Sequence, residues 1–229
     1  RRTGWIYTYD PEDEDEEGDE YWFYLSTKGE AFNDEAKDAI SGEATGVTAT
    51  DLYDGDVYEN IAAKVIKNKT YLFDGNGHML TGVLKLEGDA YRSGGSDLED
   101  GGIYYFSEED GSENGQMLTG KQTYDNEGED ETYYFKKNGQ AYTNALVSGA
   151  IYDSEGKRVD AEDGSSYMLY TVEDDIMDES GKKVLIADGT QVAVSRSGAV
   201  KKSGTVEIDG VKYTINKNTY EATEKVDND

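Results

Sequence analysis

The sequence predicts an all-β fold, a solenoid-like array of stacked β-hairpin repeats. Three observations predict it. An aromatic triplet followed by a glycine turn recurs along the chain, and tight-turn signals continue between short strand-like runs to the C-terminal region. The chain also holds 19 Tyr, 5 Phe and 2 Trp while hydrophobic residues make up only 35% of it. Such units bury their aromatic faces on their neighbours and not in one large core.

The clearest copies of the repeat occupy residues 71–82 and 104–120. The first is Tyr-Leu-Phe, three further residues and Gly-His-Met-Leu-Thr-Gly. The second is Tyr-Tyr-Phe, eight further residues and Gly-Gln-Met-Leu-Thr-Gly. Weaker copies occupy residues 133–144 and 22–33. In each copy a strand meets a glycine turn, which is typical of a β-hairpin.

This pattern, an aromatic triplet followed by Gly-x-Met-x-Thr-Gly, resembles the cell-wall-binding, choline-binding and glucan-binding repeats of bacterial surface proteins. The resemblance is clear in two units, recognisable in two more and faint elsewhere. It implies a solenoid of β-hairpins that holds a protein to envelope polysaccharide, teichoic acid or glucan. It also implies a secreted protein at the bacterial cell surface, with no catalysis by the repeats themselves.

The N-terminal elements are a hairpin followed by an insertion. Residues 4–9 alternate in polarity and predict a strand, and residues 21–25 predict its partner. The acidic run at residues 11–17 is expected to be a solvated hairpin loop, because calcium loops space their ligands around a glycine turn and this run does not. Residues 33–40 predict one or two helical turns behind an Asn cap. No metal site is expected.

Later hairpins follow from turn signals. Residues 64–66 and 70–73 predict two strands joined at Asn68, a residue type that tolerates positive φ. Asp188-Gly189 and Asp209-Gly210 each lie between two apolar runs and predict two further hairpins. Residues 151–156, 176–181 and 192–198 resemble eroded units. The chain is therefore divided into a degenerate first part with insertions (1–63), the best-kept repeats (64–145) and degenerate hairpins with a tail (146–229).

Charge restricts the partners. With 50 Asp and Glu against 22 Lys and Arg, the net charge is −28. Such a chain repels phosphate backbones, so no nucleic-acid partner is expected. Anionic bilayers are disfavoured for the same reason, and no apolar run is long enough for membrane insertion. Neutral polysaccharides, divalent cations and quaternary ammonium groups remain compatible with the charge.

No catalytic site, cofactor or nucleotide site is predicted. His78 is the only histidine and occupies the turn position that Gln116 and Gln140 fill in other units, so it is expected to be an exposed turn residue. No Gly-x-Ser-x-Gly accompanies it, and no glycine-rich loop leads into a helix. Pairs of carboxylates are unavoidable in so acidic a chain and do not indicate a glycoside hydrolase.

The candidate ligand-binding residues are aromatics and methionines of the best-kept repeats. In a strand triplet the first and third side chains share one face and the second points to the other. One face is expected to pack between hairpins, and the other is available for stacking on a sugar, with Tyr105 and Tyr134 the preferred residues. Packing of every aromatic residue is the alternative. The full candidate set is Tyr71, Met79, Tyr104, Tyr105, Met117, Tyr133 and Tyr134.

The resemblance also bears on choline. In choline-binding repeats a Trp directly after the Thr-Gly exit joins other aromatics and a Met around the quaternary ammonium group. Val83 and Lys121 occupy that place here, so choline is a doubtful ligand and a wall glycan or glucan is favoured. The leading hypothesis is a non-enzymatic module that binds envelope or extracellular polysaccharide. A structural stalk without a glycan site is the first alternative, and a glycan hydrolase is the second.

Overall fold

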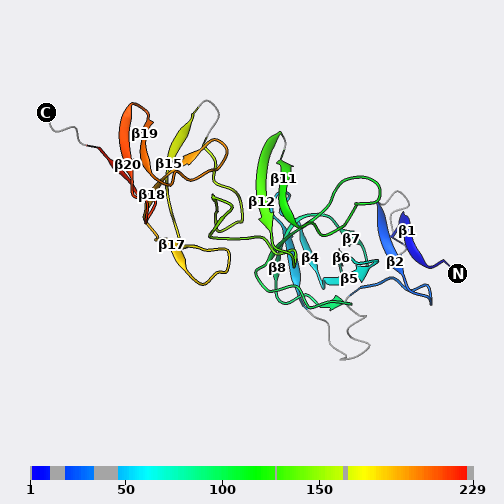
Figure 1. Cartoon of the computed structure of the whole chain (residues 1–229). Coiled ribbons are helices and arrows are strands. Elements are labelled where there is room, and N and C mark those ends of the chain that lie inside the picture. The colour runs from blue at the N-terminus through cyan, green and yellow to red at the C-terminus, as the bar shows by residue number, and fades with distance from the viewer. Residues whose placement is uncertain (1, 11–18, 34–45, 127, 162–164, 226–229) are drawn as a thin grey trace. The chain divides into compact units, whose positions relative to one another are not determined.

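The computed structural model describes residues 2–10, 19–33, 46–126, 128–161 and 165–225. Every regular element in these ranges is a strand, and most strands pair as antiparallel neighbours in small sheets (Figure 1). The prediction of an all-β array of hairpin repeats is confirmed. The predicted acidic loop at residues 11–17 and nearly all of the helical turns predicted for residues 33–40 lie outside the described residues.

The chain forms two compact units. The first comprises Arg1–Thr119 with Lys137–Gln140, and the second comprises Gly120–Lys136 with Ala141–Asp229. The strands of the first unit are β1 (Gly4–Tyr9), β2 (Glu20–Leu25), β3 (Thr48–Asp51), β4 (Val57–Glu59), β5 (Ala62–Ile66), β6 (Lys69–Phe73), β7 (Met79–Leu80), β8 (Gly82–Glu87), β9 (Arg92–Ser93) and β10 (Ile103–Phe106).

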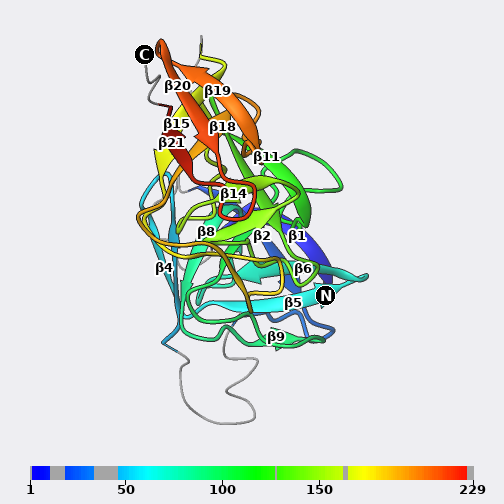
Figure 2. The same cartoon turned by 60° about the vertical axis from the view of Figure 1, so that its left-hand side comes forward.

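The second unit holds the remaining strands. They are β11 (Gly120–Asn126), β12 (Glu129–Phe135), β13 (Ala145–Val147), β14 (Ala150–Tyr152), β15 (Tyr167–Thr171), β16 (Ile176–Met177), β17 (Val184–Ile186), β18 (Gln191–Ser195), β19 (Gly204–Ile208), β20 (Val211–Ile215) and β21 (Ala222–Glu224). Two pairs are parallel, β5 with β9 and β13 with β16. Figure 2 shows β5 with β6 and β9 beside it.

One strand register recurs along the chain. In each of six antiparallel pairs, the last or next-to-last residue of the motif strand lies opposite a residue at or near the start of its partner strand. These pairs are Gly4↔Leu25, Ala62↔Phe73, Gly82↔Phe106, Gly120↔Phe135, Ala145↔Tyr152 and Met168↔Val194. Because side chains alternate between faces with a period of two, a constant register keeps each unit's aromatic triplet in the same orientation.

Several of the turns that follow a motif strand close in the same way. Asp153 accepts hydrogen bonds through Oδ1 from the backbone N–H groups of Glu155 and Lys157, both at 2.9 Å. Asp74 and Ser195 cap their own turns with a side-chain oxygen in the same manner. In the longest turn, Gly115 N–H donates to the Ser107 carbonyl at 2.7 Å. This turn is five residues longer than the turn after Phe73, yet its glycine bonds the first residue of the turn, as Gly77 N–H does when it donates to the Asp74 carbonyl at 3.0 Å.

Replacing the capping residue Asp153 with alanine is expected to lower the free energy of unfolding by about 1 to 2 kcal/mol, because two backbone N–H groups lose their acceptor. Asp153→Asn keeps an acceptor oxygen and should cost less. Urea unfolding measures both variants. Glu155→Ala at the exposed neighbouring position is the control and should change the free energy by less than about 0.5 kcal/mol. Equal effects of Asp153→Ala and Glu155→Ala would contradict the cap.

Successive units stack through the turn glycines. The residue two places after the turn glycine of one hairpin repeat lies over the turn glycine of the next repeat. A Cβ atom on Gly115 would collide with Sδ of Met79, and one on Gly139 would collide with Sδ of Met117. Smaller side chains make looser contacts of the same kind, with Ala31 3.0 Å from a Cβ built on Gly77. The turn glycine is needed both for its positive φ and for the close approach of its neighbour.

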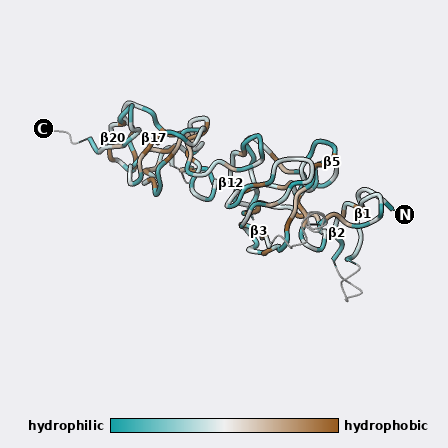
Figure 3. Tube along the Cα trace, turned by 90° about the horizontal axis from the view of Figure 1, so that it is seen from below, coloured by the Kyte–Doolittle hydropathy of each residue, from teal (hydrophilic) through white to brown (hydrophobic). Residues whose placement is uncertain are grey.

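The core is distributed over several small clusters, as expected for stacked units. In the first unit the main cluster includes Leu72, Leu84, Leu86 and Phe106, each with no exposed surface. In the second unit a separate cluster forms around Ile151 and neighbouring aliphatic residues. Figure 3 shows hydrophobic stretches recurring along the trace and not gathered in one segment. Burial therefore follows the repeat in both units.

Two of the hairpins predicted from turn signals are confirmed and one is wrong. Lys67 and Asn68 have φ of 50° and 65° between β5 and β6, and Asp209 has φ of 51° between β19 and β20. Asp188-Gly189 does not join a hairpin. β17 pairs with β16, and β18 pairs with β15. The Asp-Gly signal marks a turn, but the pairing of the flanking strands is decided by the repeat register, which no local signal contains.

Candidate ligand site

The first hairpin gathers four aromatic side chains on one face. In the pairing of β1 with β2, Trp5 lies opposite Tyr24 and Tyr7 lies opposite Trp22, and directly opposed residues share a face of the sheet. The Trp5 and Trp22 ring centroids are 6.3 Å apart with an interplanar angle of 86°. Trp22 remains 38% exposed and Tyr7 50%. This hairpin therefore presents one indole edge-on to another at the surface of its unit.

The second hairpin completes the site with Tyr71 from β6 and Met79 from β7. The Trp5 ring lies 4.8 Å from that of Tyr71 and 5.9 Å from that of Phe73, with which it is stacked. Phe73 is fully buried and also contacts Phe32, so it fixes the position of Trp5 from behind. Backbone pairing within each hairpin and aromatic packing between the hairpins thus bring the four side chains together.

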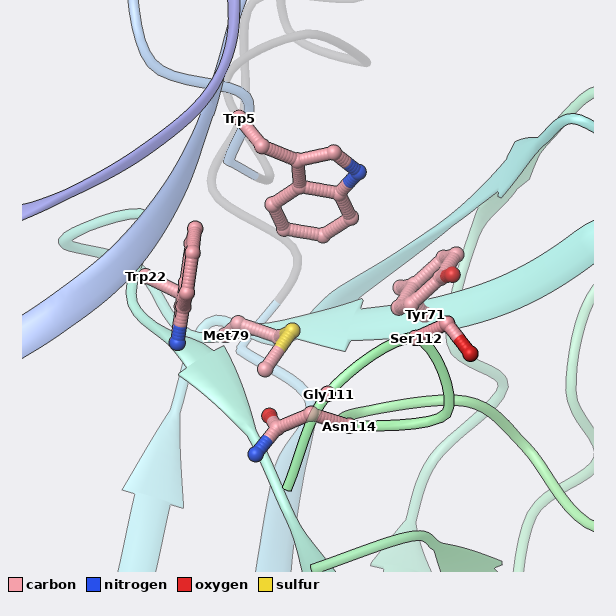
Figure 4. A pocket seen from close by; sticks show the side chains of 7 residues that line it. All are labelled: Trp5, Trp22, Tyr71, Met79, Gly111, Ser112 and Asn114. Carbon is pink, nitrogen blue, oxygen red and sulfur yellow. The ribbon is translucent and has the colours of Figure 1, made fainter. Parts of the chain in front are cut away.

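These side chains surround a cavity of about 190 Å³. Figure 4 shows Trp5, Trp22, Tyr71 and Met79 around a common space, with Gly111, Ser112 and Asn114 of the long turn after β10 at one side. The volume is below the roughly 300 to 1,000 Å³ of pockets for drug-sized ligands. A small head group fits this cavity, whereas a whole sugar chain would have to lie outside it. We refer to Trp5, Trp22, Tyr71 and Met79 as the cage.

The chemistry of the cage favours a cation. None of the described residues that line it carries a formal charge, and burial raises the pKa of Tyr71, so its phenol stays neutral at pH 7. Two indoles and a phenol present the negative potential of their ring faces, and the Met79 thioether is polarisable. A cation with N–H groups would lose hydrogen bonds to water in such a lining, whereas a quaternary ammonium group has none to lose.

The structure brings two of the seven predicted ligand residues to this cavity, Tyr71 and Met79. Tyr104 and Tyr133 are only 1% and 0% exposed, so they pack in the core and offer no surface for a ligand. The Tyr104 hydroxyl instead accepts a hydrogen bond from the Glu99 backbone N–H at 2.9 Å. Tyr105, one of the two residues preferred for stacking, is also buried and only 8% exposed.

The other two predicted residues, Met117 and Tyr134, do not line the cavity. Met117 is half-buried and packs over Gly139, the turn glycine of the next hairpin repeat. Tyr134, in the second unit, is half-buried against Tyr142 and Tyr152, with ring centroids 5.9 and 6.2 Å away. Tyr134 also borders a shallow depression of about 130 Å³ together with Lys121. The Lys121 ammonium group would repel a cationic ligand there.

Sequence reasoning missed Trp5 and Trp22, although a signal for Trp5 was present. Thr3-Gly4 is itself a Thr-Gly exit, and Trp5 follows it directly. The structure confirms this equivalence, because Gly4, Gly82 and Gly120 occupy the same register position opposite Leu25, Phe106 and Phe135. Val83 and Lys121 lack the aromatic ring, but Trp5 has it. The doubt about choline, drawn from Val83 and Lys121 alone, is therefore not supported.

His78 differs from its prediction as an exposed turn residue. It is 8% exposed, and its ring stacks on that of Tyr21 with centroids 3.8 Å apart. Nε2 lies 2.9 Å from Oδ2 of Asp10, and Nδ1 lies 3.1 Å from Oδ2 of Asp74. Burial opposes the charge on the ring, but the hydrogen bonds and charges of Asp74 and Asp10 outweigh it and raise the pKa of His78 above 6.5. The residue type at this turn position varies between hairpin repeats, and packing of the first hairpin against the turn buries the His78 side chain.

The described part of the chain holds no group of three or more His, Asp or Glu side chains placed to bind a metal ion. The described residues also include no helix long and apolar enough to cross a membrane.

No protein-family model matches the chain, and no curated protein matches it. Several solved structures are similar to this chain over most of its length. Choline-binding protein F from Streptococcus pneumoniae, in the presence of a peptidoglycan analogue, is 18% identical over 96% of this chain and 73% of that chain, with a TM-score of 0.39. The choline-binding domain of CbpL from the same organism is 15% identical over 97% and 87%, also with a TM-score of 0.39.

An alternansucrase in complex with isomaltononaose is 16% identical over 96% of this chain and 16% of that chain, with a TM-score of 0.24. The similar structures thus include choline-binding proteins, the repeat family that the two best-kept units resemble. Because these TM-scores are below 0.5, we base the function on the residues of this chain and not on these structures.

Proposed function

We propose that this chain is a binding module of the bacterial cell surface that holds quaternary ammonium groups, with choline as the ligand, on an envelope polymer. The observation that carries the proposal is the cage, in which two indoles, a phenol and a thioether surround a cavity of about 190 Å³, with no charged side chain among the described residues that line it. Cation-π attraction over Trp is the strongest of its kind, and it strengthens as the cation is removed from water.

The charge of the chain supports the same ligand. A net charge of −28 attracts cations over a distance of several ångströms, within the roughly 8 to 10 Å screening length at physiological salt. The cage itself contains no carboxylate, so the acidic surface concentrates the ligand and the aromatic lining selects it. A primary ammonium group or a sodium ion is strongly hydrated, so it loses more hydration free energy on entering the aromatic lining than a trimethylammonium group does.

The polymer that bears the ligand is proposed to be an envelope polysaccharide, and the repeats are proposed to be non-catalytic. A sugar ring can stack on the exposed face of Trp22 while its ammonium substituent enters the cage, which joins the polysaccharide and choline hypotheses in one site. Stacking of a sugar on Tyr134 remains a separate proposal for the second unit. A secreted, surface-attached protein follows from this ligand, since such polymers lie outside the cell.

Tryptophan fluorescence tests the proposal directly, because both Trp residues of the sequence lie in the cage. We expect choline to change the fluorescence of the protein with a one-site isotherm. The neutral analogue of choline in which carbon replaces nitrogen should bind about fivefold to thirtyfold more weakly, as expected for the loss of about 1 to 2 kcal/mol of cation-π attraction.

Each of the other outcomes has a definite meaning. Equal affinities for choline and for the neutral analogue would show that the cage selects shape and not charge. No response to choline, together with retention of the protein on an insoluble glucan, would replace the ammonium ligand with a sugar. No response to either ligand would leave the structural stalk as the function of the chain.

A further inference from the structure

His78 joins the two hairpins that supply the cage. Asp10 directly follows β1, Tyr21 belongs to β2, and Asp74 and His78 belong to the turn between β6 and β7. The first hairpin carries Trp5 and Trp22, and the second carries Tyr71 and Met79. His78 does not line the cavity. It lies instead at a contact between the two hairpins that form the cage walls.

We infer that His78 is a positioning residue for the cage, and that its protonation holds the first hairpin against the second and so makes ligand affinity depend on pH. This inference rests on the proposed function of the cage. Its geometric basis is that each ring nitrogen faces a different carboxylate, at 2.9 Å and 3.1 Å. Only the imidazolium ion can donate to both carboxylates, since the neutral ring has a single N–H group.

Among the described residues, groups from three segments face the ring. Asp10 follows β1, Tyr21 and Phe23 come from β2, and Asp74 precedes His78 in its own turn. Two of these described groups, the carboxylates of Asp10 and Asp74, are charged, and their side chains are 12% and 13% exposed. Neutral His78 would leave one carboxylate facing a ring lone pair, with little water to compensate. The hairpin contact is then weakened on the side of Asp10 or of Asp74.

The sign of the pH effect follows from the direction of the pKa shift. The pKa of His78 is raised in the folded protein. Its stabilising contribution is therefore complete below the unfolded pKa of about 6.5 and is lost as the pH rises through the folded value. Ligand affinity should fall over the same interval. By reciprocity, ligand that binds the assembled cage should raise the pKa of His78 further.

The single histidine makes the titration unambiguous. NMR follows the imidazole protons of His78 from about pH 5.5 to about pH 9, with and without tetramethylammonium as the probe, and Trp fluorescence gives the affinity for the probe at each pH. We expect affinity about tenfold lower at the alkaline end, equivalent to about 1.4 kcal/mol. The His78 pKa should rise by about one unit when the probe is saturating.

His78→Gln, the residue type of the sister units, should bind the probe weakly at every pH, with no dependence on pH. Asp10→Asn should reduce the pH dependence in the same way without touching the Asp74 cap. Lys157→Gln is the matched control, because Lys157 occupies the same turn position in the second unit and forms an ion pair with Glu131 at 2.9 Å. It should leave affinity and its pH profile unchanged.

The outcomes separate this inference from the proposed function. Binding that does not change with pH in the wild-type protein, with no effect of the probe on the His78 pKa, would overturn the positioning role and leave the cage intact. An identical slope of affinity against pH in His78→Gln would overturn it as well. Absence of probe binding at all pH values, with a normal His78 titration, would contradict the proposed function itself.

Discussion

Replacement of Trp22 by alanine is expected to weaken choline binding about tenfold or more. Trp22 forms one wall of the cage, and at 38% exposure it supports little of the core. The loss of one indole face removes about 1.4 kcal/mol or more of cation-π attraction. Isothermal titration with choline measures the affinity, and the fluorescence of the remaining Trp5 gives an independent value. The free energy of unfolding should change by much less than the binding energy does.

Tyr9→Ala is the matched control for Trp22→Ala. Tyr9 lies on the same hairpin, is 55% exposed and does not line the cavity. Its removal should leave the affinity for choline within about twofold. Equal losses in the two variants would mean that the exposed aromatic surface of the hairpin binds choline without any cage. Unchanged binding in Trp22→Ala would exclude Trp22 as a wall of the site.

Gly139→Ala is expected to lower the free energy of unfolding by about 2 to 5 kcal/mol. Gly139 has φ of +92°, which costs an L-residue about 1 to 2 kcal/mol, and its new Cβ would collide with Sδ of Met117. Displacing Met117 from its packed position adds about 1 to 3 kcal/mol. Gly189→Ala separates these two contributions, because Gly189 has φ of +74° and no atom near its Cβ position. Urea unfolding should show only the backbone cost in that control.

A double variant tests the origin of the Gly139→Ala effect. In Gly139→Ala with Met117→Ala the collision is removed, so the combined loss should be smaller than the sum of the two single losses. Additive losses would show that the turn glycine and the methionine of the preceding unit do not contact each other. The same contact pattern recurs at Gly115 with Met79, so a variant there should perturb both the stacking and the cage.

The amino-acid sequence by itself determined the repeating unit of this protein. A strand and its turn are specified within a few residues by Tyr-x-Phe followed by a capping Asp or Ser and a turn glycine. The positive φ of Asn68 and Asp209 likewise follows from their residue types. The all-β array was therefore predictable. Trp5 after Thr3-Gly4 also carried a readable signal. Such features depend on local backbone geometry, which a short stretch of sequence contains.

The tertiary structure alone decided which side chains meet. Asp188-Gly189 predicted a hairpin, yet its flanking strands pair elsewhere, because pairing depends on the register of whole units. Tyr104 and Tyr133 became core residues, and Trp5 and Trp22 reached Tyr71 and Met79, only when neighbouring hairpins packed. The turn position of His78 predicts an exposed side chain, but the first hairpin packs on this turn and buries it. Whether a side chain is buried depends on the neighbouring repeat that covers it, and the sequence of a single repeat does not show which residues of that neighbour it will contact.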